Sequence, residues 1–359
     1  MEDIQKRIAA IEKEMQDTPY HKGTEHYIGL LRARLAKLKE QVVERGSSKG
    51  GGGRGFAVKK HGDATVVLVG FPSVGKSTLL NKLTNANSKE AEYAFTTVTV
   101  IPGMMNYKGA RIQILDVPGL IEGAAEGKGR GREVLSVVRS ADLLLILASS
   151  GHEKDFKKIT DELYGNGVRI NQVKPQVEVQ KSATGGLVIN SSVKQDLDRE
   201  TIEDICKEFR LGHSQINIKE KLTLDRLVDS FVTNRIFTPA LFVQSKSDLN
   251  KKTVEEIDQV KVIKISATHN IGIDDLQEAI WERLGFVRVY LKNPFNDSQS
   301  YEPLIMNSKH TLKDVMRKIG TEFAENKKSA KIWGTGAKFP GQEVSLDTLV
   351  VDGIEVLFL

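Results

Sequence analysis

The eight residues Gly70–Ser77, GFPSVGKS, constrain the fold of this chain more than any other segment. They match the pattern G-x-x-x-x-G-K-[ST] of phosphate-binding loops, which join a buried strand to a helix. The apolar run TVVLVG leads into them and the helical pattern TLLNKLTNA follows, so the local context is the one that such a loop requires. Backbone N–H groups of Ser73 to Lys76 would surround a phosphate at the start of the helix, where the helix dipole favours negative charge. The segment therefore predicts a P-loop nucleotide-binding domain.

Two side chains of this loop have expected roles of their own. The Lys76 ammonium would reach the β and γ phosphates, and the Ser77 hydroxyl would bind Mg²⁺. The residues that we expect to line the nucleotide are Phe71, Pro72, Ser73, Val74, Gly75, Lys76, Ser77 and Thr78.

Short apolar runs alternate with helical patterns from Thr65 onward. Their apolarity is continuous rather than alternating, which is typical of strands buried on both faces of a parallel sheet. The runs span residues 65–70, 111–116, 142–148, 240–245 and 262–266. We therefore predict an α/β fold in which a mostly parallel sheet is flanked by helices.

Further parts surround this predicted sheet. About ninety residues separate its third and fourth strands, too many for a loop in a compact domain, and they hold a hairpin-like stretch at 176–192 and a helical pattern opening on Asp198. Heptad-like spacing near the N-terminus predicts an antiparallel helical hairpin before the glycine-rich joint Gly46–Gly55. Near the C-terminus, short β runs surround one helix capped by Thr311, which predicts a small α+β module.

These patterns divide the chain into four parts. We place a helical hairpin and linker at residues 1–60, the nucleotide-binding domain at 61–152 and 237–287, an inserted α+β subdomain at 153–236, and a C-terminal module at 288–359.

A second phosphate-site motif, DVPG, begins at Asp116. A carboxylate at the end of a buried strand suits a Mg²⁺ partner, and the Gly119 N–H would meet a γ-phosphate because glycine lets the backbone come close. In YAFTTVTV, either Thr96 or Thr97 would give a hydroxyl to Mg²⁺ and a backbone contact to the γ-phosphate. The same β-branched residues also fit an edge strand.

The motif SKSD, residues 245–248, predicts the choice of base. The Asp248 carboxylate would accept hydrogen bonds from guanine N1–H and the 2-amino group, a pair that adenine does not offer. The Lys246 stem would lie along the base. The following motif SAT, comprising Ser266, Ala267 and Thr268, would turn N–H groups toward guanine O6.

Composition limits the cellular compartment and the kinds of partner that we expect. The chain has one cysteine, Cys206, and no run of eighteen apolar residues, so we expect a cytoplasmic protein without disulfides or a membrane partner. The net charge is +5, and residues 1–62 carry 13 Lys/Arg against 8 Asp/Glu. This basic N-terminal segment indicates either a polyanionic partner or a solvated helical face.

Together, GFPSVGKS, YAFTTVTV, DVPGLIEGAAEGKGRGREVLS, SKSD and SAT resemble the Obg-related GTPases, and most closely the developmentally regulated GTP-binding (DRG) family. The resemblance implies GTP and GDP as ligands, Mg²⁺ as cofactor, and Thr97 rather than Thr96 as the metal ligand. The implied metal ligands are Ser77, Thr97 and Asp116, and the implied catalytic residues are Lys76, Thr97 and Gly119.

The same resemblance covers the flanking parts. It implies that the insert is similar to domain 2 of ribosomal protein S5. It also implies that the C-terminal module, ending in WGTGAKFPGQEVSLDTLVVDGIEVLFL, is a ubiquitin-like TGS domain.

The chain departs from family patterns at two positions. Ser245 stands where the guanine motif usually has Asn, and we expect a serine to make fewer bonds to the surrounding loop. Ser73 stands where potassium-dependent relatives usually carry Asn, so potassium dependence is left undecided.

The stretch from Gly119, the last residue of DVPG, to Gly131 holds five glycines in thirteen residues. Its first residue after the motif is Leu120, where Ras-like GTPases place the glutamine that orients water, so we expect slow intrinsic hydrolysis. We interpret the glycine-rich segment as a switch that the γ-phosphate or a partner orders.

The resulting hypothesis is a GTPase switch that contacts the ribosome or another RNA through the basic hairpin and the TGS-like module. The alternatives are a signalling switch regulated by a protein partner, and an ATPase or kinase that shares only the phosphate loop.

Overall fold

A computed structural model describes residues 2–47, 61–84, 101–117, 137–249, 254–293, 296–299, 302–324 and 327–359. The chain forms two compact units, one made of Met1–Gly55 with Gly167–Phe237, the other of Phe56–Asn166 with Thr238–Leu359. Our predictions for Thr96, Thr97, Gly119, Leu120 and the glycine-rich segment fall outside the described residues.

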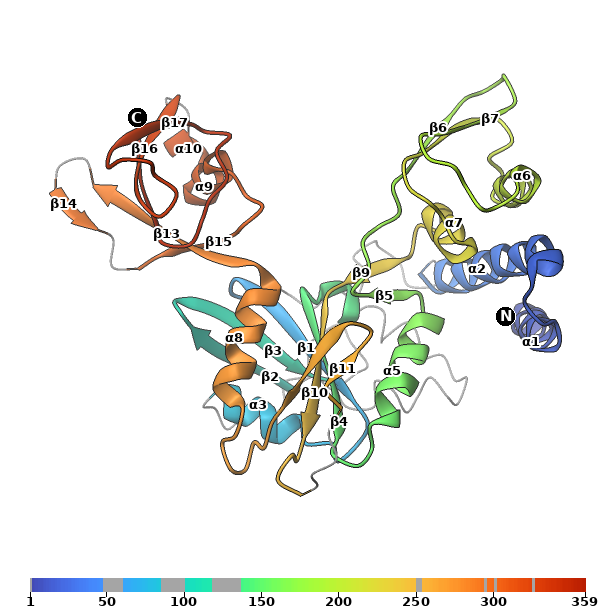
Figure 1. Ribbon diagram of the computed structural model, residues 1–359, viewed down its shortest axis with the longest axis horizontal. Coiled ribbons are helices and arrows are strands. Elements are labelled where there is room, and N and C mark those ends of the chain that lie inside the picture. The colour runs from blue at the N-terminus through green and yellow to red at the C-terminus, as the bar shows by residue number, and fades with distance from the viewer. Residues whose placement is uncertain are drawn as a thin grey trace. The chain divides into compact units, whose positions relative to one another are not determined.

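The second unit contains the predicted sheet (Figure 1). Its seven strands run in the order β11-β12-β10-β4-β1-β3-β2. The neighbours from β12 to β3 pair in parallel, and β2 and β11 are antiparallel edge strands. The strands are β1 (Ala64–Gly70), β2 (Ile101–Tyr107), β3 (Ala110–Asp116), β4 (Leu143–Ser149), β10 (Ala240–Ser245), β11 (Glu256–Ile257) and β12 (Val260–Lys264). The predicted mostly parallel α/β fold is confirmed.

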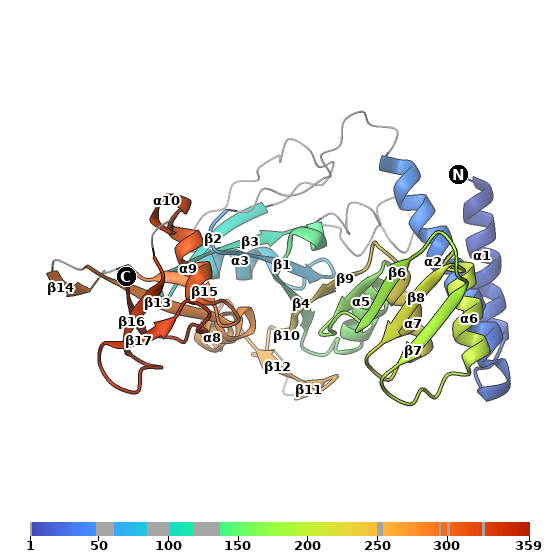
Figure 2. The same cartoon turned by 90° about the horizontal axis from the view of Figure 1, so that it is seen from above.

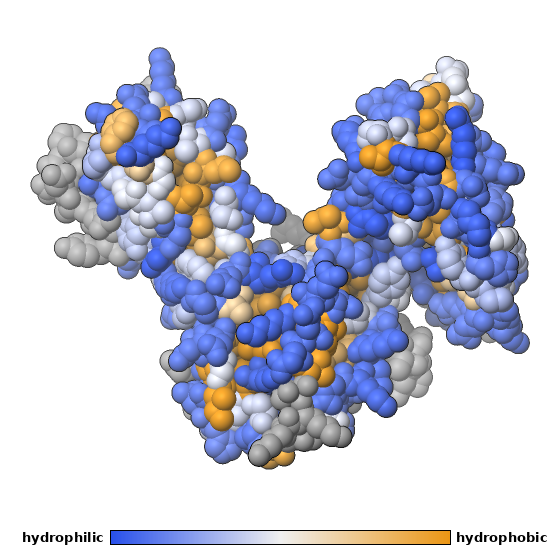
Figure 3. Space-filling view, in the orientation of Figure 1, coloured by the Kyte–Doolittle hydropathy of each residue, from blue (hydrophilic) through white to orange (hydrophobic). Residues whose placement is uncertain are grey.

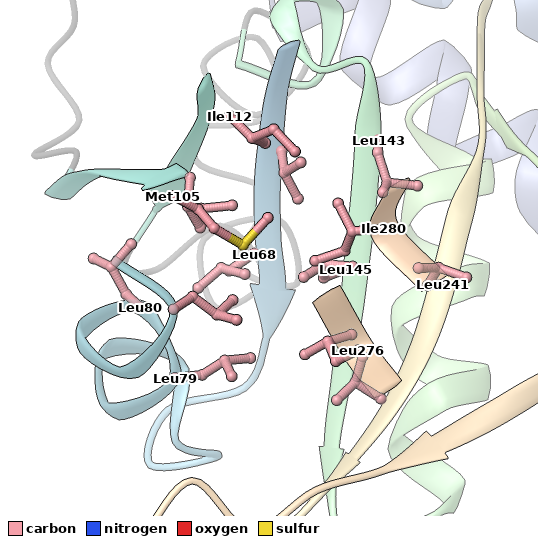
Figure 4. Close-up of a cluster of buried hydrophobic side chains, with 14 of the residues drawn as sticks. Leu68, Leu79, Leu80, Met105, Ile112, Leu143, Leu145, Leu241, Leu276 and Ile280 are labelled. Carbon is pink, nitrogen blue, oxygen red and sulfur yellow. The ribbon is translucent and has the colours of Figure 1, made fainter. Parts of the chain in front are cut away.

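Helices cover both faces of this sheet. The helices α3 (Lys76–Thr84) and α8 (Ile273–Leu284) pack on one face, where Leu80 and Ile280 join a cluster with Leu68 and Leu145 (Figure 4). On the other face, α5 (Lys154–Gly165) places the Phe156 ring edge-on to Phe242 of β10. Because side chains alternate along a strand, strands covered on both faces must be apolar throughout, which explains the continuous apolar runs.

The C-terminal part of the second unit is a small α+β structure. Its strands are β13 (Phe286–Asn293), β14 (Asn296–Gln299), β15 (Leu304–Asn307), β16 (Ser329–Gly334), β17 (Gln342–Ser345) and β18 (Ile354–Phe358), and its helices are α9 (Leu312–Ile319) and α10 (Thr321–Ala324). Thr311 begins α9 as expected, through a reciprocal capping box with Asp314.

The first unit joins the N-terminal helices to the insert (Figure 2). Its helices are α1 (Glu2–Asp17), the 3-10 turn Lys22–Thr24, α2 (Glu25–Ser47), α6 (Arg199–Glu208) and α7 (Leu224–Phe231), and its strands are β5 (Val168–Ile170), β6 (Val177–Lys181), β7 (Leu187–Ser191), β8 (Ser214–Ile218) and β9 (Ile236–Thr238). Helix α2 contacts α1, as the heptad-like pattern predicts, and also contacts α6 and α7.

The hairpin expected within residues 176–192 is wrong. β6 and β7 do not pair with each other, because β8 lies between them, antiparallel to β6 and parallel to β7. β8 contributes the buried Ile216 and Ile218, whereas β6 and β7 are half exposed. The strand whose alternate isoleucines are buried therefore takes the centre, although it is further along the chain.

The boundaries of the insert also differ from those expected. Helix α5 lies in the second unit, although its residues fall in the predicted subdomain 153–236, and Phe156 shows why: its ring packs on the central sheet. The N-terminal helices and the insert form one unit rather than two.

Helix α2 has a second buried face that the heptad pattern did not reveal. Ala33 and Ala36 lie in the core of the insert with Ile205 and Leu224. A methyl group added at Gly29 would lie 3.0 Å from a Leu224 methyl and 3.1 Å from an Ile205 methyl, so small residues set the approach of the helices. The insert core is thus incomplete without the N-terminal helix.

Most basic side chains of α2 form ion pairs with acids of the first unit. Arg32 pairs with Asp225 at 2.9 Å, and Lys37 with Glu208 at 3.0 Å. The basic charge of the N-terminal segment is therefore partly balanced by acids of the insert.

Cys206 is buried in the insert core. Burial raises the pKa of its thiol to about 12, so at pH 8 only roughly one thiol in ten thousand is a thiolate. We expect the native chain to react with a thiol reagent orders of magnitude more slowly than the chain unfolded in guanidinium, which a colorimetric thiol assay measures. Equal rates in both states would contradict the buried position.

In the described part of the chain, no helix has the length and apolarity needed to cross a bilayer. The face seen in Figure 3 is mainly hydrophilic, with hydrophobic atoms in interrupted patches.

Candidate functional site

The loop between β1 and α3 has the backbone conformation of an anion-binding turn. Ser73 and Gly75 have positive φ angles of 58° and 99°. Alternation of left-handed residues with ordinary ones directs successive N–H groups toward one point. Gly70 is needed for close packing, because a Cβ there would lie 2.9 Å from the Leu147 carbonyl oxygen.

Lys76 is buried and its ammonium folds back over the loop. The Nζ atom donates to the carbonyl oxygens of Gly70 at 2.8 Å and Phe71 at 2.9 Å. This places one positive charge inside the ring of loop N–H groups, where a phosphate would be attracted.

Ser77 and Asp116 meet at the start of α3 and the end of β3. The Ser77 hydroxyl donates to one Asp116 carboxylate oxygen at 2.6 Å. The other oxygen, Oδ1, is buried and has no hydrogen-bond partner among the described residues, which is costly for a carboxylate. A hard cation with oxygen ligands and bound water removes that cost, so the pair fits Mg²⁺ as predicted.

The guanine motif follows β10 and is tied to the phosphate loop. Lys246, which has a φ angle of 55°, donates from Nζ to the Ser73 carbonyl at 2.8 Å. The Asp248 side chain lies beside this turn and is one-fifth exposed. The two motifs, more than 160 residues apart, therefore lie next to each other at the carboxyl edge of the sheet.

Ser245 keeps a bond to the phosphate loop. Its hydroxyl lies 2.7 Å from the Val74 carbonyl oxygen and 3.4 Å from that of Ala148. We expected fewer bonds from a serine at this position, and the structure shows that the hydroxyl still reaches the loop.

The motif SAT lies at the end of β12. Ser266 is fully buried, and its N–H donates to the Ile271 carbonyl at 3.0 Å. This N–H is already used, so an oxygen of a bound base would be reached by Ala267 or Thr268 instead.

The sequence analysis missed His269. Its ring Nδ1 lies 3.0 Å from the Ser266 hydroxyl and 3.6 Å from the Asp248 carboxylate. Its position three residues after Ser266 was the available signal, but a lone histidine in a turn did not indicate this contact.

The structure thus brings together the phosphate loop, Asp116 and the guanine motif at one edge of the sheet. Of the predicted lining residues, Phe71 also lies near α5, where the Lys158 ammonium is 5.8 Å from the ring centre. Among the described residues no cluster of three or more His, Cys, Asp or Glu side chains fits a metal.

The Asp248 carboxylate is held in its ionised form. A hydrogen bond from the Ser266 hydroxyl lowers its pKa below the ordinary value, with a further contribution from His269, although partial desolvation opposes this. An acid with a lowered pKa loses its charge only as the pH falls through that lowered value.

We therefore expect the ratio of GDP to inosine diphosphate affinity to stay constant from pH 8 to about pH 5 and to fall only below that. Inosine lacks the 2-amino group, so the ratio isolates the carboxylate from titration of the shared diphosphate. Competition against a fluorescent GDP measures it. A ratio that falls already between pH 7 and 5 would contradict this ionisation state.

Comparisons with known proteins agree on one family. The model of the 50S ribosome-binding GTPase family matches residues 65–181, and the model for the C-terminal region of that domain matches residues 184–286. An uncharacterised GTP-binding protein of Methanocaldococcus jannaschii is 46% identical over 359 residues, covering 98% of this chain and 91% of the relative. Developmentally-regulated GTP-binding protein 1 of Xenopus laevis is 41% identical over 357 residues, covering 96% of each chain.

Among solved structures, the YchF GTPase of Schizosaccharomyces pombe aligns with 85% of this chain and 100% of its own at 13% identity. The TM-score is 0.47, a distant likeness.

Proposed function

Because this chain belongs to the family of developmentally regulated GTP-binding proteins, we propose that it is a Mg²⁺-dependent GTPase switch that acts on the ribosome. It binds GTP and GDP, hydrolyses GTP to GDP and phosphate, and works in the cytoplasm. A TGS domain at residues 288–359 belongs to this proposal.

One observation carries the nucleotide part. Ser245 and Lys246 directly precede the turn that carries Asp248. The Lys246 ammonium and the Ser245 hydroxyl both bind carbonyl oxygens of the phosphate loop. A base and a phosphate chain bound at these two places would therefore be held by one connected structure.

The residues divide the work as follows. The loop N–H groups and Lys76 hold the phosphates, Ser77 and Asp116 hold Mg²⁺, and Asp248 selects guanine. Mg²⁺, when bound, neutralises charge on the phosphate oxygens. Thr97 and Gly119 complete the γ-phosphate contacts in this proposal, and Leu120 leaves the attacking water without a glutamine, so hydrolysis is slow without an activator.

The nucleotide part is tested by phosphate release from GTP with and without Mg²⁺, beside the Lys76→Ala variant. We expect slow, Mg²⁺-dependent release that Lys76→Ala abolishes together with GTP binding. Equal binding of ATP and GTP would instead revive the alternative of an ATPase or kinase.

The ribosome part rests on the basic N-terminal segment and the C-terminal module. Pairing of Arg32 and Lys37 with acids of the insert reduces the positive charge that α2 presents to an RNA. This pairing favours a second candidate, a switch whose partner or regulator is a protein.

Co-sedimentation with ribosomes separates the two candidates. The chain is loaded with GDP or with a non-hydrolysable GTP analogue and pelleted at two salt concentrations, because non-specific binding to RNA falls steeply with salt. Pelleting that requires the analogue and survives the higher salt supports the ribosome. Pelleting that is equal for both nucleotides, or absent, supports the protein partner.

A further inference from the structure

The turn after the SAT motif contains a short chain of polar groups that ends on the base-reading carboxylate. Ser266 Oγ lies 3.0 Å from His269 Nδ1 and also accepts the His269 backbone N–H at 3.4 Å. His269 Nδ1 also lies 3.6 Å from Asp248 Oδ2, and the Ser266 side chain is the largest cause of the lowered pKa of Asp248. Thr268 Oγ1, 3.4 Å from Ser266 Oγ, is the other side-chain oxygen in this turn.

The chemistry of these groups fixes the direction of donation. An ionised carboxylate only accepts hydrogen bonds, so a group that faces it must be a donor. His269 Nδ1 faces both the Asp248 carboxylate and the Ser266 oxygen. It follows that His269 carries a proton on Nδ1 and donates toward these two oxygens.

The burial of the three polar side chains differs, and the buried Ser266 is held rigidly while His269 is exposed. Ser266 is fully buried, the Asp248 side chain is 20% exposed, and the His269 side chain is 62% exposed. Recognition of N1–H and the 2-amino group together needs both carboxylate oxygens in the plane of the base. A carboxylate oriented before binding avoids the cost of ordering it on binding.

We propose that His269 is a positioning residue for guanine recognition, which acts together with Ser266 to orient the Asp248 carboxylate. This role rests on the proposed binding of guanine by Asp248. The ammonium of Lys246, two residues before Asp248, is bound to the Ser73 carbonyl of the phosphate loop.

The test compares His269→Leu, which removes the donor, with His269→Gln, whose amide restores an N–H. Affinities for GDP and inosine diphosphate are measured by competition against a fluorescent GDP. We expect His269→Leu to weaken GDP binding roughly three- to tenfold and to lower the GDP-to-inosine ratio by a similar factor, because one net hydrogen bond is of this size. His269→Gln restores most of the ratio, which general loosening of the turn would not do.

The matched control is His213→Leu, an exposed histidine of the other unit, which leaves both affinities unchanged. Nitrogen-15 NMR of His269 supplies a second readout, in which the Nδ1-protonated form supports the proposal and the Nε2-protonated form overturns it. Normal GDP affinity with an unchanged ratio in His269→Leu overturns the role of His269 alone. Failure of the parent chain to bind GDP would overturn the proposed function with it.

Discussion

Asp248→Asn is expected to weaken GTP binding by roughly a hundredfold or more and to create affinity for xanthosine triphosphate. In the proposed site the carboxylate accepts from two guanine N–H groups, whereas the amide of asparagine has an N–H₂ donor in place of one oxygen and sets donor against donor. Xanthine carries an oxygen where guanine has the 2-amino group, and that oxygen matches the new donor. Competition of GTP, ATP and xanthosine triphosphate against a fluorescent nucleotide measures the change.

The matched control for this variant is Asp161→Asn, an exposed position on α5 in the same unit. It makes the same chemical change away from the site and should leave all three affinities as they are. GTP affinity that survives Asp248→Asn would show that another group reads the base. The asparagine still offers an oxygen to the Ser266 hydroxyl, so collapse of the turn is not the expected cause of a loss.

Ala33→Glu is expected to disrupt the first unit while nucleotide binding by the second unit persists. Ala33 has no exposed surface and lies among apolar side chains of α6 and α7. An ionised carboxylate there has no partner, and an unpaired buried charge costs roughly 3–5 kcal/mol of folding free energy. Thermal unfolding followed by circular dichroism, together with limited proteolysis of residues 167–237, reports on this unit.

Ala9→Glu is the control, because Ala9 is an exposed alanine of α1 and the same substitution there should change stability by less than about 0.5 kcal/mol. Proteolysis of Ala33→Glu at the rate of the parent chain would show that α2 does not complete the insert core. If Ala33→Glu loses both the fold of the insert and GDP binding, the two units are not independent.

The sequence predicted where the loop between β1 and α3 forms, because its residues occupy positions that local structure dictates. A phosphate loop needs Gly70 for close backbone packing and Gly75 for its positive φ angle. The residues directly before and after the loop predict the strand and the helix that it joins. Continuous apolar runs likewise indicate a doubly covered sheet, since each strand must bury both faces. Thr311 and Asp198 marked helix starts for the same local reason.

Contacts between distant segments were decided by the tertiary structure. Which strand lies between β6 and β7 depends on how three strands share one apolar face, and no short segment contains that information. The second face of α2 is defined by Ala33 and Gly29, small residues whose burial matters only once α6 and α7 are beside them.

The candidate site shows the same division. The sequence by itself predicts which residues would contact phosphate, metal and base, because each motif carries its chemistry within a few positions. Only the tertiary structure decided that Ser245 and Lys246 hold the phosphate loop and that His269 reaches Ser266 and Asp248. The physical reason is that hydrogen bonds depend on distances of a few tenths of an ångström, which packing of the whole sheet sets and a linear pattern does not contain.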